Sequence, residues 1–276
     1  MIYITVPTNE DLFGKNKLDI INKIGLPANV TDYAIINGIF VGDYYTDIIR
    51  SNLANRTGYY ITKFEENDEH NHVVIIDGSG LAHTHDYRFA GVRPIIHYDT
   101  LEELTNELII ENDIKYINYG QYPMNVVNSK QQNILESLFQ NEELTISKDV
   151  ISQNVSLNYD DFIPGYKIVY ELDGKKYIRC HINKDLIYGK DGVILSDGNF
   201  YPVDSYAWIN IEKIKWYVNE RHKTLLSENV LFSARGYHEP LSYEQGLEDN
   251  GIDYFLNNSF KEEINSNSKV KKLTRK

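Results

Sequence analysis

Short runs in which apolar and polar residues alternate fill the first 98 residues, and this pattern predicts strands more than helices. Residues 2–6 alternate in this way. After a cap-like Thr31-Asp32 pair comes a short apolar segment whose helical periodicity is weak. From Thr57 onward, polar or glycine-containing turns separate the runs GYYITKF, HVVIIDGSGLAHTH and GVRPIIHY. We therefore expect a small antiparallel sheet in this part of the chain.

Two later segments repeat their apolar residues at helical spacing. Residues 99–112 follow a cap-like Asp99-Thr100 pair and carry acids in the first turn, so they predict a surface helix. Its apolar residues would be Leu101, Leu104, Leu108 and Ile109. Residues 129–144 predict a second amphipathic helix. Its apolar face would hold Ile134, Leu135, Leu138 and Phe139.

The rest of the chain predicts strands and one more helix. Residues 147–165 are polar and indicate a long loop. Beyond them, DG turns separate strand-like runs such as YKIVYEL, KKYIRCHI and YAWINIEKIKWYVNE. A final helix is expected over 251–264. The pattern therefore places strands on both sides of a few helices.

Composition supports a folded chain of 276 residues, because 42% are hydrophobic, 25% are charged and only 7 are proline. Cys180 is the only cysteine, which excludes an intrachain disulfide and a cysteine-based zinc site. His181 follows it on a predicted strand and points to the opposite face, so we expect a buried, inert thiol. Since no signal peptide or run of 18 apolar residues is present, we expect a cytoplasmic location and no contact with a membrane.

The charge distribution argues against nucleic acid as a partner. The formal net charge is −12, and the five basic residues of 269–276 leave −17 on residues 1–268. An acidic body repels phosphate backbones. We interpret the basic tail as a frayed, solubilising terminus, although it could also bind nucleic acid or an acidic partner.

Four histidines surround one tight turn, and whether they meet depends on the length of that turn. They are His70, His72, His83 and His85. If Gly78 and Ser79 form a two-residue loop, all four share one face of a hairpin and could bind zinc. A three-residue loop places the first two histidines on the face opposite the last two. The alternative to a metal site is a set of exposed histidines at the end of a strand.

Other motifs for catalysis are missing from the sequence. It contains no GxGxxG after a strand, no GxxxxGK[ST], no GxSxG and no HExxH. Glu142-Glu143 and Asp160-Asp161 lie in polar surroundings and are interpreted as solvated charges. The 22 tyrosines are more informative, because tyrosine offers a large contact area with a polar tip and suits a binding face. We expect the two tryptophans in the core.

Several strings in order resemble a large uncharacterised family of bacterial and phage domains. YGQYPMNVV, ELDGKKYIRC, YAWINIEKIKWYVNE, LLSENVLFSARGYHE and IDYFLNNSFKEEI are similar to the first half of that family, which begins with FGxYPQ. TDYAIING, TGYYITKF and GVRPIIHY are similar to its second half, but here they come first. The resemblance therefore implies a circularly permuted domain, or one whose neighbouring half a relative supplies.

The GVRP strand and the hairpin before it are similar to the C-type-lectin-like fold, which the formylglycine-generating enzymes share. This resemblance implies an α+β architecture of twisted antiparallel sheets with a few helices and long loops. The resemblance divides the chain into an N-terminal part (1–113), a C-terminal part that completes the fold (114–268) and the basic tail (269–276). In such relatives the segment before the closing strand contacts ligands, and this implies a site within residues 63–88. Its residues here would be Lys63, His72, His83, His85, Tyr87 and Arg88. Arg93 would serve structure by pairing with a buried carboxylate or with carbonyls.

Three functions follow from these observations. The leading hypothesis is a non-enzymatic binding module that recognises a protein or a glycan through residues 63–88 and nearby aromatic loops. The first alternative is a metal-dependent enzyme or a zinc-stabilised domain built on the histidine face. The second is a phage-borne inhibitor that occludes a host protein. Formylglycine chemistry is not expected, because the cysteines that it needs are absent.

Overall fold

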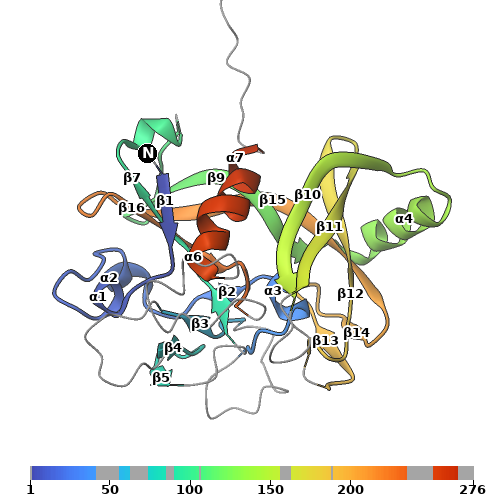
Figure 1. Ribbon diagram of the computed structural model, residues 1–276, viewed down its shortest axis with the longest axis horizontal. Coiled ribbons are helices and arrows are strands. Elements are labelled where there is room, and N and C mark those ends of the chain that lie inside the picture. Colours follow the sequence, from blue (N-terminus) through green and yellow to red (C-terminus); the bar gives the residue numbers. More distant parts are fainter. Residues whose placement is uncertain are drawn as a thin grey trace, which may run out of the picture.

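In the computed structural model, the protein consists mainly of antiparallel strands with a few helices (Figure 1). This confirms the predicted α+β class. Among the residues described, no helix has the length and apolar character needed to cross a bilayer. The described residues are 2–41, 56–62, 74–84, 90–105, 107–155, 163–187, 189–234 and 251–266.

A large antiparallel sheet forms the centre of the molecule, and β15 (Tyr206–Asn219) is its central strand. β9 (Ile114–Val126) runs along one edge of β15. The other edge pairs first with β12 (Lys175–His181) and then with β16 (Thr224–Ser227). The remaining strands of this sheet are β1 (Ile2–Thr5), β7 (Ile95–Tyr98), β8 (Ile109–Glu111), β10 (Thr145–Val155) and β11 (Ile163–Leu172).

Shorter strands form a second sheet and two small pairs. The second sheet has the order β18 (Phe232–Ser233), β6 (Gly91–Val92), β3 (Tyr60–Ile61), β4 (Val74–Ile76) and β5 (Ala82–Thr84). β3, β4 and β5 pair antiparallel as predicted, whereas β3 and β6 are parallel. The pairs are β2 (Asn29–Val30) with β17 (Asn229–Val230), and β13 (Gly192–Ile194) with β14 (Phe200–Pro202).

The helices are short except for α4. α4 (Ser129–Gln140) confirms the second predicted amphipathic helix, and the Asn128 side chain caps it by accepting from the Gln131 N–H at 3.0 Å. The C-terminal helix also forms, with a π-helical middle. The other helical segments are α1 (Asn9–Leu12), α2 (Ile21–Ile24), α3 (Asp32–Ile36), a 3₁₀ turn (Leu101–Glu103), α6 (Ile252–Phe255), the π-helical segment (Leu256–Phe260) and α7 (Lys261–Ser266).

The main core draws on strands and helices from both halves of the chain. Tyr122 of β9 packs edge-on against Tyr33 of α3 and against Phe260 of the π-helical segment, with ring centroids 5.9 and 5.2 Å apart. Trp216 is fully buried and donates its indole N–H to the Tyr119 carbonyl at 2.8 Å. Burial of such large aromatic groups is the main favourable contribution to folding. The prediction that both tryptophans lie in the core is confirmed, since Trp208 is also buried.

The GVRP strand fixes a second part of the core through Arg93. This side chain is 1% exposed, and its guanidinium donates to the carbonyls of Ser227 at 2.9 Å and Leu26 at 3.2 Å. It also lies over the Tyr60 ring, 5.4 Å from the centroid. The expected structural role for Arg93 is confirmed, with carbonyls as its hydrogen-bond partners.

The first strand is held by the last helical segment. The Asn257 amide accepts from the Ile4 N–H at 2.9 Å and donates to the Ile4 carbonyl at 2.8 Å, so it satisfies the free edge of β1. Lys261 donates to the Ile2 carbonyl at 2.6 Å. The opposite edge of β1 pairs with β7. The described N- and C-terminal elements therefore lie side by side, as Figure 1 shows.

The predicted helix over 99–112 is wrong. Only Leu101–Glu103 form a helical turn, and Ile109–Glu111 form β8, which pairs with the start of β9. Asn112 and Asp113 connect these strands with φ angles of 49° and 62°. Two successive positive φ angles are typical of the type I′ turn that closes a two-residue hairpin. The apolar spacing that suggested a helix belongs to a turn followed by a β-branched edge strand.

Two further predictions need correction. Residues 147–155 lie in β10 rather than in a loop, and β10 pairs with β11 across an irregularity between Ile146 and Val150. The irregularity and an exposed outer face hide the period of two that marks a regular strand. In α4, Leu135 is buried, but Ile134 is 40% exposed and does not share its face.

Candidate functional site

The β4–β5 hairpin has a three-residue loop instead of the two-residue loop of Gly78 and Ser79. Ile75 lies opposite His83, and Asp77 closes the hairpin by donating its N–H to the Leu81 carbonyl at 3.0 Å. Gly80 has a φ of +86°, the left-handed residue that such loops require. The predicted face shared by four histidines requires a two-residue loop, and that loop does not form.

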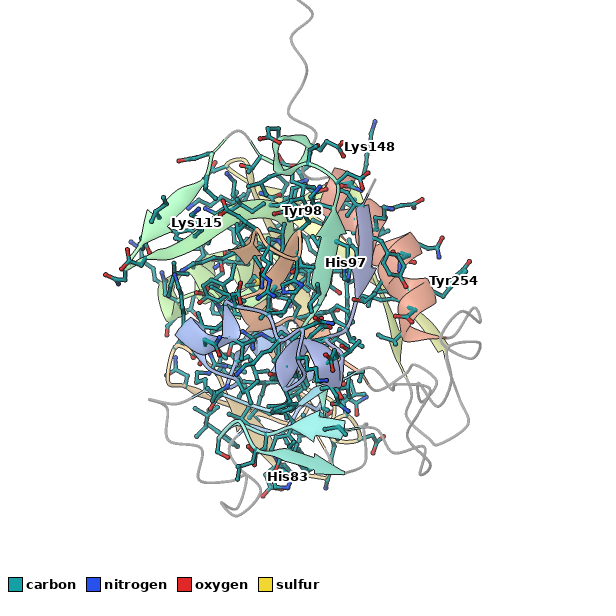
Figure 2. The ribbon with its side chains drawn as sticks, turned by 90° about the vertical axis from the view of Figure 1, so that its left-hand side faces the viewer. His83, His97, Tyr98, Lys115, Lys148 and Tyr254 are labelled. Atoms are coloured by element: carbon teal, nitrogen blue, oxygen red, sulfur yellow. The ribbon has the colours of Figure 1, made fainter. Side chains whose placement is uncertain are left out.

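The histidine of this hairpin that the structure describes serves the turn. The Asp77 carboxylate is buried and accepts from the N–H groups of Ser79 and Leu81 at 2.9 and 3.0 Å. Its second oxygen lies 2.9 Å from His83 Nε2. Figure 2 shows His83 at one extreme of the molecule, opposite Lys148. His83 is thus held against the turn, with 21% of its side chain exposed.

Most residues of the predicted sites lie outside the described part of the chain. They are Lys63, His70, His72, His85, Tyr87 and Arg88. Within the described ranges, no three His, Cys, Asp or Glu side chains form a group that could hold a metal ion. The ligand and metal assignments for these six residues stay predictions.

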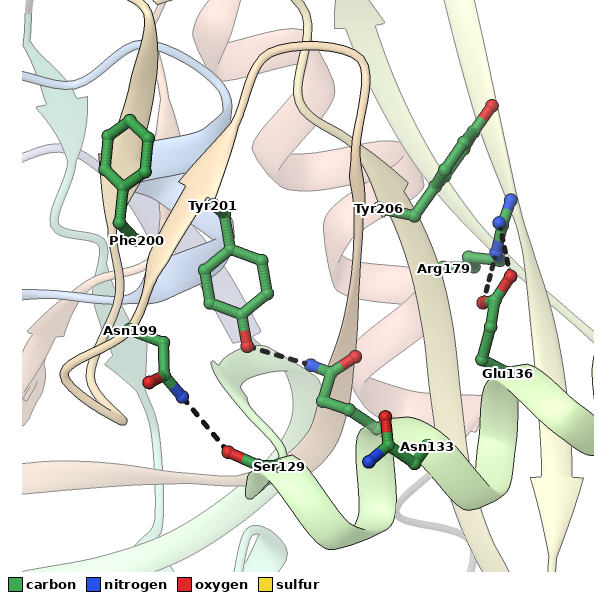
Figure 3. A pocket seen from close by; sticks show the side chains of 9 residues that line it. Ser129, Asn133, Glu136, Arg179, Asn199, Phe200, Tyr201 and Tyr206 are labelled. Atoms are coloured by element: carbon green, nitrogen blue, oxygen red, sulfur yellow. Dashed lines mark hydrogen bonds and ion pairs between the residues drawn. The ribbon is translucent and has the colours of Figure 1, made fainter.

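A cavity of about 360 Å³ lies elsewhere, beside α4. It falls in the size range of about 300–1,000 Å³ that is typical of ligand sites. Figure 3 shows its walls: α4 on one side, the β13–β14 hairpin on another, and β12 and β15 behind. We call it the α4 groove, and its lining residues are Ser129, Gln132, Asn133, Glu136, Arg179, Asn199, Phe200, Tyr201 and Tyr206.

The α4 helix is fixed to the large sheet by both apolar and polar contacts. Leu135 and Phe139 pack against Trp208, and the rings of Phe139 and Trp208 lie 5.8 Å apart. The Gln132 side-chain amide accepts from the Trp208 backbone N–H at 3.0 Å and donates to the Trp208 carbonyl at 3.2 Å. It thus makes the two backbone hydrogen bonds that a residue of a neighbouring strand makes. Trp208 also donates its indole N–H to Glu136 at 3.0 Å. One tryptophan therefore anchors the helix that lines the groove.

An ion pair crosses the groove. Glu136 accepts two hydrogen bonds from the Arg179 guanidinium, at 2.8 and 3.0 Å, a bidentate geometry that favours both charges. These bonds hold the pKa of Glu136 at about 2, although burial opposes the shift. The guanidinium stacks over the Tyr206 ring, 3.4 Å from its centroid, and faces Phe139 at 4.5 Å. Glu136 is therefore ionised at neutral pH, and both of its oxygens are bonded to Arg179. An acid–base catalyst needs a pKa near the working pH, so this carboxylate does not suit that role.

The β13–β14 wall is positioned by a buried carboxylate far away in the sequence. Asp32, in the first turn of α3, is 0% exposed and forms an ion pair with Arg56. It also accepts from the N–H groups of Ser196 at 2.9 Å and Val126 at 2.8 Å, and from the Ser196 hydroxyl. Asp32 is therefore a positioning residue that ties the hairpin to α3 and β9.

The turn of this hairpin orients two of the lining residues. Asp197 accepts from the Asn199 N–H at 3.0 Å, the Asn199 amide at 2.8 Å and the Tyr201 hydroxyl at 2.9 Å. Burial, reinforced by the hydrogen bond to Asp197, raises the pKa of Tyr201, so its hydroxyl stays protonated. Asn199 donates onward to Ser129 at 3.1 Å and links the hairpin to α4. The wall is fixed before any ligand arrives.

Two aromatic rings remain exposed at the rim of this fixed frame. Phe200 is 57% exposed and Tyr206 is 45% exposed. Figure 3 shows the first on the hairpin and the second on the sheet, on opposite sides of the groove. The ring of His181 supports Tyr206, with centroids 5.0 Å apart. The groove combines a polar floor with two aromatic flanks.

The abundance of tyrosine in the sequence predicts an aromatic binding face, but it does not predict this groove. The missed signal is the run FYPVDSYAW directly after a DG turn, which sets aromatic residues on both arms of a tight connection. Comparisons with protein-family models, with curated proteins and with solved structures found nothing that matches this chain. The chemistry of the groove is therefore the basis for a functional proposal.

Proposed function

We propose that this protein is a binding module that holds a protein segment or a glycan in the α4 groove. The observation that carries the proposal is the pair of exposed rings, Phe200 and Tyr206, on a frame that is already rigid. Exposed aromatic groups on fixed supports give contact area with little loss of conformational entropy. The ionised and paired state of Glu136 supports binding over catalysis.

The groove and the predicted hairpin site are two different surfaces. Figure 1 sets β4 and β5 at one lower side of the molecule and α4 at the opposite side. The segment 63–88 stays a second candidate surface. The groove is preferred because its lining side chains bond to one another and hold two exposed aromatic rings in place.

The proposal is tested by screening glycan and peptide libraries with the intact protein and with two matched variants. Phe200→Ala removes a groove ring, whereas Phe13→Ala removes an equally solvated ring, 48% exposed, at the end of α1. We expect a ligand whose affinity falls at least tenfold in Phe200→Ala and stays unchanged in Phe13→Ala. Equal affinity for both variants, with thermal melting unaltered, contradicts a site in the groove.

We further propose that the fold is a circularly permuted C-type-lectin-like domain. The adjacency of β1 and the Asn257 segment supports it, because a permuted chain needs its joined ends close together. The test is a superposition on C-type-lectin-like domains with residues from 114 onward placed before those up to 113. A match in strand order supports the permutation, and a mismatch in the β9–β15–β12 order contradicts it.

A further inference from the structure

The charges that line the α4 groove cancel. Glu136 and Arg179 are its two charged lining residues, and their two hydrogen bonds neutralise them mutually. Asp197, behind Tyr201, leaves a residual negative charge, and the chain as a whole carries −12. Phosphate and carboxylate ligands meet an unfavourable field here. The groove is therefore suited to a ligand without anionic groups.

The polar groups that remain are neutral amides and hydroxyls. Asn133 lies on α4 between Ser129 and Glu136, with its amide exposed (Figure 3). Among the described residues, none hydrogen-bonds that amide. Asn199 adds an acceptor, because its amide N–H groups already donate to Asp197 and Ser129 and leave the side-chain carbonyl oxygen for a ligand. A side-chain amide offers a donor and an acceptor side by side, which matches two neighbouring hydroxyl groups.

The aromatic flanks supply the other half of the recognition. Phe200 and Tyr206 expose 57% and 45% of their surfaces on opposite sides of the polar floor. An aromatic ring face is electron-rich and attracts the slightly positive C–H groups on the apolar face of a pyranose. A peptide anchor needs a deep, dehydrated apolar pocket for its hot-spot side chain, and the lining residues of this open groove are mostly polar.

We infer that the ligand of the α4 groove is a neutral saccharide, stacked on Phe200, flanked by the exposed part of Tyr206 and hydrogen-bonded by Asn133 and Asn199. This inference rests on the proposed binding function and names the class of its ligand. A cavity of about 360 Å³ holds a short stretch of such a chain, with the remainder in solvent. The rigid hairpin keeps the stacking surfaces in place before the sugar arrives.

The test is a nuclear magnetic resonance titration of the intact protein that follows the side-chain amide signals of Asn133 and Asn199. The probes are maltotriose, cellotriose, mannotriose and diacetylchitobiose, then sialyllactose as an anionic sugar, then a pool of unstructured peptides. We expect at least one neutral sugar to shift both signals. Its affinity should fall at least tenfold in Phe200→Ala and about fivefold in Asn133→Ala.

The control variants separate stacking from folding. Phe200→Trp keeps an aromatic face and should retain the affinity, whereas Phe13→Ala should change nothing. If only peptides shift the groove signals, the saccharide class is wrong; if only sialyllactose does, the neutral charge of the ligand is wrong. In both cases the binding function stands. If no probe shifts them at millimolar concentration, both proposals fail together.

Discussion

The β4–β5 and β13–β14 hairpins are both built around an aspartate followed by glycine, yet they expose different chemistry. Asp77 accepts from the N–H groups of Ser79 and Leu81 and contacts His83. Asp197 accepts from Asn199 and from the Tyr201 hydroxyl. In the first hairpin, the described histidine is engaged by the turn. In the second, the turn is complete without Phe200, which is left to solvent.

His83 belongs to a residue type that suggests a site in a sequence, whereas Phe200 is the side chain that the structure leaves accessible for binding. Histidine is a familiar metal ligand, so four of them near one turn suggest a site. A turn aspartate is a competing partner for such a side chain, and His83 contacts it. Phe200 has no polar group that the turn could engage, so its ring stays exposed on the hairpin and is available to a ligand.

The largest expected effect concerns the carboxylate beneath the β13–β14 hairpin. Asp32→Asn places an amide donor among the N–H groups of Ser196 and Val126 and removes the partner of Arg56. We expect a loss of about 3 kcal/mol in the free energy of unfolding, measured with urea. Asp19→Asn, which breaks an exposed pair with Arg221, is the control and should cost about 0.5 kcal/mol. Equal losses in the two variants contradict the positioning role.

The two turn aspartates give the sharpest form of the comparison. Asp77→Ala removes the buried acceptor of the Ser79 and Leu81 N–H groups and should cost about 1 kcal/mol of stability, with ligand affinity of the groove unchanged. Asp197→Ala should cost about 1 kcal/mol but weaken ligand binding at least tenfold, since Asn199 and Tyr201 lose their common acceptor. Calorimetric titration beside thermal melting measures both quantities. A reversed pattern would assign the binding role to the β4–β5 hairpin.

The ion pair of the groove predicts a dependence on pH. The folded-state pKa of Glu136 is about 2, below its ordinary value of 4.5, so the pair stabilises the fold above pH 4.5. This contribution is lost as the pH falls from 4.5 through 2. Because Glu136 is 37% exposed, solvent screening limits it to about 1 kcal/mol. The stability difference between the wild type and Glu136→Gln should be constant from pH 5 to 7 and shrink below pH 4.5; a constant difference down to pH 2 contradicts it.

The smallest effects distinguish a structural side chain from a binding one. His83→Ala should lower stability by about 0.5 kcal/mol and leave the ligand affinity of the groove unchanged, because His83 contacts Asp77 on a hairpin that does not line the groove. Phe200→Ala should leave the melting temperature unchanged and lower the affinity. Melting curves and ligand titrations on both variants measure the two quantities. A loss of affinity in His83→Ala contradicts the structural role of His83.

The sequence predicts those elements whose pattern is satisfied locally. The apolar repeat around Leu135 marks α4, and the alternation from Ile2 marks β1. The pattern fails at residues 109–111, where a turn at Asn112 and Asp113 decides the structure. It fails again in β10, because an edge strand with an irregular register has no regular alternation.

The groove is invisible to local patterns for a different reason. Its residues come from α4, from β12 and from the β13–β15 region, and they meet because of contacts between distant segments. Ser196 is 164 residues from Asp32, and Gln132 is 76 residues from Trp208. A single sequence gives no measure of such proximity. The rings of Phe200 and Tyr206 could be named as aromatic, but not placed on opposite sides of one cavity.

The contact between Ile4 and Asn257 has a consequence for the order in which the chain becomes ordered during synthesis. A ribosome makes Ile4 first and Asn257 253 residues later. Until then, one edge of β1 has to be hydrated or covered by something else, and it can pair with any exposed strand nearby. The nascent chain therefore carries an open edge through most of its synthesis. Completion of the C-terminal helix is the event that closes it.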